Sequence, residues 1–396
     1  MTSFLKAQQD SDEIGTVRQK RSLAMEIQLF VATRKEMSMK KIKSIELVGE
    51  LLKRYESQHE RVQAYFGLLA YYALTQAALC SGNEVYLKKS KEYLKQYPDH
   101  FDHPQYSFEA YRAGGNAKAW LFFKGKAPEW SACIDEYAQK TMEAPADENG
   151  ILCLHSDSSR KRIWIDVVTC ITPFMLYAGL ALHKERYIDF AAEQCFKMYE
   201  VFLDHTCGLL HQARGFLPNP KRITSDHWSR GNGWGLLGLA ELVRYLPEDS
   251  KHRAKAEEYF VDMVDALLPY QTERGLWRQE ITEPMAWEES SGTGLILYCI
   301  GIGLRTGILK SDMYRTAFER GIAGLAEYCL DDNFATYRGC PGCMCPRIGD
   351  EIGTVRAYIT GKIPQKDEVH SYGCMMLAFV EAYRNGIVDV EIKGNI

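Results

Sequence analysis

The apolar pattern of its helices is the feature of this sequence that most constrains the fold. Some helical stretches are amphipathic, such as SKEYLKQY and RAKAEEYFVDMVDALLPY, whereas others are apolar on nearly every side, such as TCITPFMLYAGLAL and GLILYCIGIGL. A helix that is apolar all round is surrounded by protein, while an amphipathic helix shows one face to solvent. The two kinds alternate along the chain. This alternation predicts an inner ring of buried helices wrapped by an outer ring of half-exposed helices.

Helical periodicity extends over most of the chain. The segments that carry it are 41–56, 60–81, 84–96, 110–124, 128–141, 167–183, 186–204, 233–246, 251–271, 290–305, 311–330 and 371–385. No long run alternates as strands do, and no Pro- or Ser-rich linker divides the chain. We therefore predict an all-α fold, an (α/α)6 barrel, as a single domain over residues 41–396. Residues 1–40 are polar and weakly patterned, and we expect a partly ordered tail with a first helix there.

An internal repeat supports this barrel. The segments ENGILCLH, TCGLLHQA and ERGLWRQE each follow an amphipathic helix and lead through a polar loop into an apolar one. Their glycines, Gly150, Gly208 and Gly275, stand where a helix would stop. A repeat of about 60 residues is long enough for two helices and a short extended segment. The inner helices then all point the same way, and the loops that precede them meet at one end of the barrel, where we expect the active site.

Composition narrows the possible partners and compartments. The net charge is −4 and both signs are interspersed, so we expect no nucleic-acid binding, which needs a basic face. The N-terminus lacks the apolar core of a signal peptide, and the apolar run Leu295–Leu304 is too short to span a bilayer, so no membrane association is expected. The 12 cysteines are scattered and several lie in apolar helices, which indicates free thiols in a reducing compartment. We therefore predict a cytoplasmic protein.

One of the polar loops, RKRIWIDVVTCITP, carries a candidate catalytic acid. Asp166 follows Trp164 and immediately precedes an apolar helix. An aromatic neighbour and partial desolvation raise the pKa of a carboxyl group and keep a general acid protonated near neutral pH. The alternative is that Asp166 is an ordinary helix cap, since Asp is common at that position.

A second loop, SDHWSRGNGWGLLGLAEL, has the composition of a sugar-binding site. Trp228, Arg230, Asn232 and Trp234 lie within seven residues around two glycines. Aromatic faces stack on sugar rings, while Arg and Asn bind hydroxyl and carboxylate groups. The alternative is a Gly-rich helix entrance with packed tryptophans. The glycine spacing also matches a dinucleotide fingerprint, but no strand precedes it, so no nucleotide cofactor is expected.

Three further candidates are weaker. Glu288 and Glu289 precede an apolar helix and are candidate catalytic carboxylates, although first-turn acids favoured by the helix dipole explain them as well. His211 follows the second repeat glycine and is expected to reach the same end of the barrel, although a single His is more often structural. Three cysteines in the loop RGCPGCMCPR, namely Cys340, Cys343 and Cys345, resemble part of a zinc site. Because no fourth ligand stands at the usual spacing, we expect no zinc there and no metal or cofactor elsewhere.

These residues resemble the motifs of glycoside hydrolase families 105 and 88, the unsaturated uronyl hydrolases, and family 105 more than 88. The family sequence Trp-Ala-Arg-Gly-Asn-Gly-Trp is similar to Trp228–Trp234, and its Trp-Leu-Asp-Gly-Leu-Tyr-Met is similar to the segment from Trp164. Its Gly-Leu-Trp-His-Gln resembles the segment from Gly275, and its Glu-x-Ser helix start resembles the segment from Glu289. The resemblance extends from about residue 100 to the C-terminus. The chain departs from the family at Val167-Val168-Thr169.

The resemblance implies an (α/α)6 barrel that removes a 4,5-unsaturated uronic acid from the non-reducing end of lyase-generated oligosaccharides. The partner it implies is therefore a small anionic oligosaccharide. By resemblance Asp166 is the acid/base and His211 a substrate-contacting or assisting residue. Further residues would line the sugar subsite, namely Trp164, Trp228, Arg230, Asn232 and Trp234. A second substrate-contacting acidic position has no clear match, and Asp102 and Asn116 are its candidates.

Two classes of alternative function remain open on the sequence. One is another (α/α)6 enzyme, either a saturated uronidase or a sugar epimerase. Epimerases use paired histidines near the barrel mouth, and the ten histidines show no such pair in the sequence. The other is a carbohydrate-binding barrel without activity, against which the intact Trp-x-Asp and Trp-x-Arg-Gly-Asn-Gly-Trp motifs argue.

Overall fold

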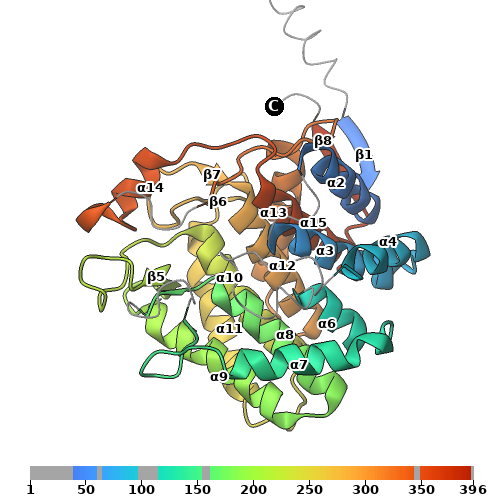
Figure 1. The fold of residues 1–396 in the computed structure, drawn as a ribbon. Helices are drawn as coiled ribbons and strands as arrows, with labels where there is room; N and C mark the ends of the chain where they lie inside the picture. Colours follow the sequence, from blue (N-terminus) through green and yellow to red (C-terminus); the bar gives the residue numbers. More distant parts are fainter. Residues whose placement is uncertain (1–38, 60–64, 97–114, 154–160, 343–347, 394–396) are drawn as a thin grey trace, which may run out of the picture.

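The computed structural model describes residues 39–59, 65–96, 115–153, 161–342 and 348–393, and the account below concerns these residues. Most of them lie in helices that follow one another around the molecule (Figure 1). Six helices form the inner ring: α3 (Tyr65–Ser81), α6 (Gly115–Phe123), α8 (Val167–Leu182), α10 (Ser229–Tyr245), α12 (Ser290–Thr306) and α15 (Val369–Arg384). Each packs against the next, and α15 packs back against α3. The inner ring is therefore closed.

Six other helices alternate with these along the chain and form the outer ring. They are α2 (Ser44–Gln58), α4 (Glu84–Leu94), α7 (Ser131–Met142), α9 (Glu185–Phe202), α11 (Arg253–Leu267) and α13 (Asp312–Tyr328). α9, for example, packs against both α8 and α10, and α13 packs against both α12 and α15. The predicted (α/α)6 barrel is thus confirmed, and the twelve predicted helices correspond to these twelve. A short helix that the sequence did not predict, α14 (Val355–Gly361), lies outside the two rings.

The inner helices are apolar all round because protein surrounds them on every side. In α12, every residue from Ser290 to Gly303 is buried. Small residues let these helices approach closely: a Cβ atom on Gly294 would lie 2.7 Å from the backbone carbonyl of Cys374 in α15. The outer helices bury one face only, such as Ala256, Phe260 and Met263 in α11. In the sequence, the all-apolar pattern therefore indicates a fully buried inner helix, and the amphipathic pattern indicates a half-exposed outer helix.

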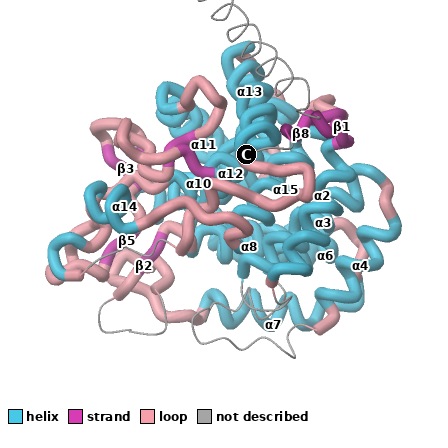
Figure 2. Tube along the Cα trace, turned by 90° about the horizontal axis from the view of Figure 1, so that it is seen from above, coloured by secondary structure: helices cyan, strands magenta, loops and turns pink. Residues whose placement is uncertain are grey.

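Strands are few and short, and Figure 2 shows them among the loops. Antiparallel pairs join β2 (Ile163–Trp164) to β5 (Ala213–Arg214), β3 (Leu203–Asp204) to β4 (Leu209–Leu210), and β6 (Trp277–Arg278) to β7 (Glu288–Glu289). A longer pair joins β1 (Met39–Lys43) to β8 (Asp389–Lys393), with Met39 opposite Lys393. This pair closes the barrel by joining the first and last described segments.

The β1–β8 pair corrects the expectation of a helix from residue 41. Val390 and Ile392 are buried, while Asp389 and Glu391 between them are exposed, which is strand alternation over five residues. So short an alternation is not distinct from loop sequence. Met39 and Lys40 belong to β1, and the remainder of the predicted 1–40 segment lies outside the described residues.

The repeat is confirmed and has one more copy than the sequence indicated. Gly150, Gly208 and Gly275 all have left-handed backbone, with φ of 75°, 75° and 82°. Each closes a tight turn after an outer helix; the Gly275 N–H, for example, donates to the Thr272 carbonyl. The fourth copy has Phe334 in the same conformation, with φ 62°, and its N–H donates to the Asp331 carbonyl. Because it lacks the glycine, the fourth copy was not recognised.

A buried carboxylate ties the inner ring together. Glu241 in α10 is fully buried and accepts hydrogen bonds from three tyrosine hydroxyls: Tyr72 at 3.0 Å, Tyr177 at 2.7 Å, and Tyr298. These tyrosines belong to α3, α8 and α12, so one side chain links four inner helices. Burial raises the pKa of all three tyrosine hydroxyls well above the usual value, so they remain donors. Arg244 lies 3.6 Å from the same carboxylate and balances its charge.

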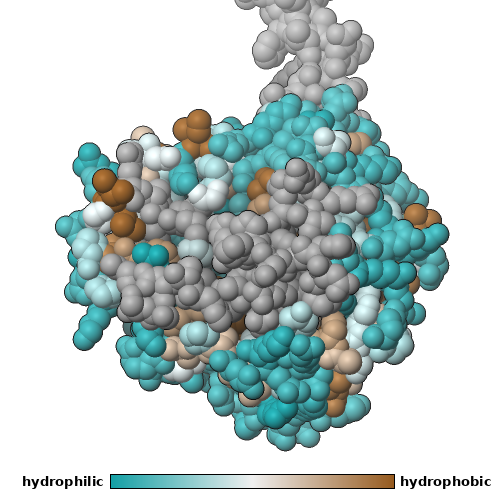
Figure 3. All heavy atoms as spheres, in the orientation of Figure 1, coloured by the Kyte–Doolittle hydropathy of each residue, from teal (hydrophilic) through white to brown (hydrophobic). Residues whose placement is uncertain are grey.

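The described surface carries no sign of a membrane-spanning segment. Among the helices of the described residues, none combines the length and apolar character needed to cross a bilayer. The face drawn in Figure 3 is mostly hydrophilic where its residues are described, and its apolar side chains lie singly or in small groups.

We predict that Glu241→Ala destabilises the barrel strongly, because it removes the acceptor of three buried hydroxyls. Each buried polar group left without a partner costs about 1–3 kcal/mol. The free energy of unfolding, measured with urea, should therefore fall by at least about 3 kcal/mol. Glu241→Gln keeps one acceptor oxygen and should lose less. Glu248→Ala, at an exposed position, is the control and should change stability by less than about 0.5 kcal/mol. A Glu241→Ala loss below about 1 kcal/mol would contradict the role given to this carboxylate.

Candidate active site

The N-terminal ends of all six inner helices meet at one end of the barrel. The Tyr65 ring at the start of α3 lies 6.2 Å from the Trp234 ring in α10 and 5.4 Å from the His370 ring in α15. Asn116 in α6 donates to the Thr169 carbonyl in α8 at 2.8 Å. Arg230 in α10 donates to the Ser291 hydroxyl in α12 at 2.8 Å. The loops before the inner helices therefore converge, as the repeat predicted.

Asp166 lies in the last turn before α8, with helical backbone and no capping hydrogen bond from its side chain. Its Oδ2 atom is buried and has no hydrogen-bond partner among the described residues. Burial raises the pKa of Asp166 to about 6, although the nearby Arg230 charge opposes this shift. The ordinary helix cap that the sequence left open is thus not what the geometry shows. A carboxyl group with this pKa can exchange a proton near neutral pH.

Arg230 brings a fixed positive charge to the same region. It is fully buried in the first turn of α10, and its guanidinium carbon lies 4.5 Å from the centre of the Trp228 ring. Its Nη1 atom donates to the Ser291 hydroxyl and, at 2.7 Å, to the Cys340 carbonyl. Asp166 and Arg230 lie at the N-terminal ends of the packed helices α8 and α10, and the Arg230 charge opposes the rise in the pKa of Asp166. The structure thereby brings together the two motifs on which the sequence prediction depended.

The three predicted tryptophans lie around these charges. Trp164 stacks on Phe216 with ring centres 5.2 Å apart, while Trp228 and Trp234 are almost completely buried. The indole N–H groups of all three tryptophans are buried without a hydrogen-bond partner in the described part of the chain. Buried N–H groups are normally paired, so donors left over at one place indicate a polar ligand.

Asn232 has a different setting from the one predicted. Its side-chain oxygen accepts from the Leu210 N–H at 2.8 Å, and its amide nitrogen donates to the carbonyls of Leu210 and Trp228, each at 3.0 Å. The side chain is fully buried. These bonds hold β4 against the first turn of α10. The structure therefore gives Asn232 a positioning task, and its predicted contact with a sugar has no support in this geometry.

His211 lies beside the site and is paired with another histidine. Its Nδ1 atom lies 3.2 Å from the Asp226 carbonyl, and its ring centre lies 4.8 Å from that of His227. The expectation that the chain has no histidine pair near the barrel mouth is therefore wrong. The two residues are 16 positions apart, in different loops, and only the fold brings them together.

Glu289 is a helix cap rather than a catalytic carboxylate. Its oxygens accept from the Ser291 and Gly292 N–H groups at 2.6 and 2.5 Å, and from the Ser229 hydroxyl at 2.7 Å. Glu288 lies 3.2 Å from Arg274 in an ion pair. The alternative interpretation of these acids, as groups favoured at a helix N-terminus, fits the contacts.

The sequence analysis missed a buried pair of acids and a buried acid–histidine pair. Asp226 is fully buried and its pKa is raised to about 6, first by burial; it also raises the pKa of the buried Glu280. Glu368 and His370, at the start of α15, pair at 2.7 Å. Asp226 stands two residues before Trp228, inside the loop already singled out, and this position was the available signal. Nothing in the local sequence distinguishes Glu280 or Glu368 from solvated acids.

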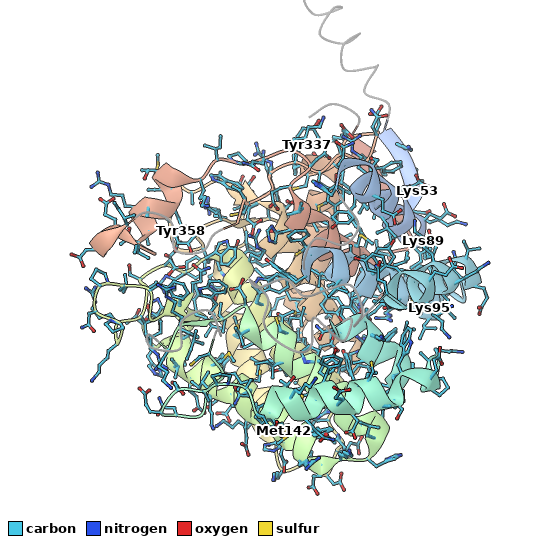
Figure 4. The ribbon with its side chains drawn as sticks, in the orientation of Figure 1. Lys53, Lys89, Lys95, Met142, Tyr337 and Tyr358 are labelled. Carbon is cyan, nitrogen blue, oxygen red and sulfur yellow. The ribbon has the colours of Figure 1, made fainter. Side chains whose placement is uncertain are left out.

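A small cavity opens beside Trp234 and the first turn of α8. Its described lining includes Tyr65, Asn116, Thr169, Cys170 and Trp234. Asn116, one candidate for a second substrate contact, is therefore at the site, whereas Asp102 lies outside the described residues. Tyr358 extends from α14 toward the barrel loops (Figure 4), where its hydroxyl donates to Gln212 next to His211.

The cysteine-rich loop is described only in part. Cys340 is buried, and its carbonyl accepts from Arg230 as noted above. Cys343 and Cys345 lie outside the described residues. The expectation that this loop binds no zinc stays a prediction.

Comparison with known proteins gives a consistent assignment. A family model described as Glycosyl Hydrolase Family 88 matches residues 40–386. The unsaturated 3S-rhamnoglycuronyl hydrolase of Formosa agariphila is 38% identical over 117 residues, which are 29% of this chain and 30% of that protein. The match thus spans less than one third of that relative's length.

Two further relatives match over greater lengths. The unsaturated rhamnogalacturonyl hydrolase YesR of Bacillus subtilis is 22% identical over 279 residues, covering 67% of this chain and 76% of that protein. A crystal structure described as a possible member of the GH105 family, from Salmonella enterica serovar Paratyphi A, superposes with a TM-score of 0.74 at 16% identity. It covers 87% of this chain and 95% of that one, and shows that the two share a fold.

We predict that Asp166→Asn stabilises the protein at alkaline pH and not at acidic pH. Because the folded pKa of Asp166 is about 6, above the unfolded value of about 4, the penalty on folding grows from about pH 4 and is complete above about pH 6. Each pKa unit corresponds to about 1.4 kcal/mol, so the variant should gain up to about 2–3 kcal/mol at pH 8. The gain should vanish below about pH 4, where both states are protonated. Thermal melting at pH 4 and pH 8 checks this. A variant that melts lower than wild type only at pH 8 would instead show that the charge of Asp166 stabilises the fold.

Proposed function

The chain belongs to glycosyl hydrolase family 88, and from this premise we propose that it removes a 4,5-unsaturated uronic acid from the non-reducing end of lyase-generated oligosaccharides. The observation that carries the proposal is the buried, unpartnered Oδ2 atom of Asp166, whose pKa is about 6, at the meeting point of the inner helices. A carboxyl group that titrates near the working pH can give and take the same proton. The proposed reaction needs such a group.

The chemistry follows from the enol ether in the substrate. Asp166 protonates C4 of the C4=C5 double bond, and the ring oxygen stabilises the cation that forms at C5. Water adds to C5 while the Asp166 carboxylate takes its proton back, so the acid is restored. The resulting hemiketal loses its hydroxyl proton and opens to a ketone at C5. The hemiacetal at C1 then collapses and releases the remaining sugar with that proton.

One carboxyl group therefore suffices for both proton transfers. Ordinary glycosidases instead use two carboxyl groups on either side of the scissile bond. Two buried acids beside Arg230 already have partners, Glu289 in capping bonds and Glu368 in its contact with His370, so neither replaces Asp166 as the proton donor. Arg230 supplies the positive charge toward which an anionic sugar is attracted, and Trp164, Trp228 and Trp234 supply ring faces and N–H donors.

We assign His211 an assisting role through its contacts. Its Nδ1 atom donates to the Asp226 carbonyl, and it thereby fixes the loop that leads into Trp228 and Arg230. Asn232 acts similarly by holding β4 against α10. Both residues position the groups that bind the sugar.

The relatives suggest which sugar to test first. Two of them are named as unsaturated rhamnoglycuronyl and rhamnogalacturonyl hydrolases, so we propose a substrate in which the unsaturated uronic acid is joined to rhamnose. We also propose that the protein works in the cytoplasm, because none of the ten described cysteines forms a disulfide.

The pair His211 and His227 makes a sugar epimerase a second candidate function. One assay distinguishes an epimerase from the proposed hydrolase. An epimerase would invert a sugar centre without releasing the neighbouring sugar. The hydrolase releases it and removes the alkene, so ultraviolet absorbance falls. A panel of saturated and unsaturated uronyl disaccharides, with and without sulfate, assigns the reaction and the substrate together. A binding protein without activity would leave all of these disaccharides unchanged.

We predict that Asp166→Asn lowers turnover of an unsaturated uronyl–rhamnose disaccharide by at least about 10²–10⁴-fold, the range typical of losing general acid–base catalysis. Asparagine keeps nearly the same shape but cannot deliver the proton, so sugar binding should persist. Loss of alkene absorbance measures turnover, and calorimetry measures binding.

Asp249→Asn, at an exposed position, is the matched control and should keep wild-type turnover. An Asp166→Asn protein that melts normally and retains more than about one tenth of wild-type turnover would refute the catalytic assignment.

We predict an alkaline limb in the activity profile. Because Asp166 must be protonated to begin the reaction, kcat/KM should fall about tenfold for each pH unit above about 6. Initial rates between pH 4 and 8 check this. A profile that stays flat to pH 8 would exclude Asp166 as the proton donor.

A further inference from the structure

Four side chains with metal-binding atoms converge beside the proposed sugar site. The Oδ2 atom of Asp204 lies 3.1 Å from Nε2 of His227 and 3.8 Å from Nε2 of His211. These three atoms all lie within 4.8 Å of one another. The Sγ atom of Cys207 lies 3.6 Å from Nε2 of His227. From this geometry we propose that Asp204, Cys207, His211 and His227 bind a divalent transition metal ion, for which zinc is the preferred match.

Three of the separations among these atoms are those of tetrahedral zinc ligands. Zinc binds histidine nitrogen and carboxylate oxygen at about 2.0–2.1 Å and thiolate sulfur at about 2.3 Å. The corners of such a tetrahedron are about 3.3–3.7 Å apart. The observed separations of 3.1, 3.6 and 3.8 Å scatter around that range. Two neutral imidazoles, a carboxylate and a thiolate also neutralise the two positive charges of the ion.

The second contact of each ligand fits the same interpretation. The Nδ1 atom of His211 faces the Asp226 carbonyl at 3.2 Å, and Nδ1 of His227 faces the Thr282 hydroxyl at 3.4 Å. The Oδ1 atom of Asp204 accepts from Thr206 N–H at 2.8 Å, so Oδ2 is directed at the histidines. Metal-binding histidines usually use their other nitrogen in this way, which fixes the ring.

The hydrogen-bond roles of His211 point to a cation. Its Nδ1 must donate, because a carbonyl oxygen only accepts. In the neutral ring, Nε2 then presents a lone pair toward the Asp204 carboxylate, which also presents lone pairs. A metal ion between the two atoms would bind both lone pairs. The Cys207 thiol and the His227 ring, which stacks on His211, are further groups that a metal ion can bind.

The site would act as a clamp. Asp204 and Cys207 flank the turn between β3 and β4, His211 follows β4, and His227 directly precedes Trp228 at the start of α10. With four protein ligands the coordination is closed, which is typical of a structural metal. A bound ion would therefore join the second repeat hairpin to the loop that carries Trp228 and Arg230. This proposal does not rest on the proposed function, since metal binding is measured without a sugar.

The sequence predicted no metal because its cysteine–histidine spacing matches no zinc motif. The ligands come from a hairpin and from a loop that follows it, so their order depends on the fold. The three-cysteine loop at Cys340, which attracted attention in the sequence, contributes none of the four.

The test uses the full-length chain without a histidine tag. The protein is incubated with zinc, freed of unbound ion by gel filtration, and measured by elemental mass spectrometry; we expect about one zinc per chain. Cobalt loaded in place of zinc should give a thiolate-to-cobalt band in the near ultraviolet. Cys207→Ser should abolish that band, and His227→Ala should weaken zinc binding by at least about 10²-fold.

Cys340→Ser is the matched control and should retain zinc and the cobalt band. Circular dichroism identifies any variant that fails to fold, and Cys207→Ser, which replaces sulfur by oxygen in the same shape, keeps the test available if His227→Ala does not. Less than about 0.1 zinc per chain in the wild type with zinc in excess would overturn the proposal. So would loss of zinc in Cys340→Ser with retention in Cys207→Ser, because the ion would then lie in the cysteine-rich loop.

Discussion

The closed inner ring depends on a polar contact at its centre. Apolar helices of similar length can slide and rotate against one another with little change in buried area, so apolar burial alone does not fix their register. Three tyrosine hydroxyls that must all reach the carboxylate of Glu241 do fix it, because an unsatisfied hydroxyl in the core costs more than most packing errors. Tyr72, Tyr177 and Tyr298 thereby set the relative height of α3, α8, α10 and α12.

That register decides where the helix N-termini end. Once α8 and α10 are fixed at Glu241, Asp166 and Arg230 are carried to the same side of the barrel, about three turns away along their helices. The alternation of outer and inner helices points every inner N-terminus toward this end. Partial positive charge from the helix dipoles accumulates there and favours an anionic ligand. The chemistry of the mouth is thus a consequence of packing about three turns deeper in the barrel.

The fold could be predicted from the sequence because the apolar pattern of each helix indicates, by itself, how far that helix is buried. The composition differs over a full helix length between an inner helix such as TCITPFMLYAGLAL and an outer one such as RAKAEEYFVDMVDALLPY. This difference can be interpreted without knowing which helices are neighbours. The β1–β8 pair was missed because five alternating residues carry too little signal. Phe334 hid the fourth repeat, since it takes the backbone conformation that glycine has in the other three. The first failure concerns a short segment whose conformation depends on a distant partner, and the second concerns a local turn that closes without glycine.

The candidate site residues also differ in whether the local sequence indicates them. Asp166, Trp228, Arg230 and Trp234 could be predicted because each lies in a short motif with its own chemistry. Asn232 belongs to the same motif, yet its contacts are with Leu210 and Trp228, and only the position of β4 reveals this. His227 sits in the motif loop directly before Trp228, but its significance depends on His211 and Asp204, which the β3–β4 hairpin brings to it. Local motifs therefore locate candidate ligand-binding groups, while groups that contact one another become visible only in the folded chain.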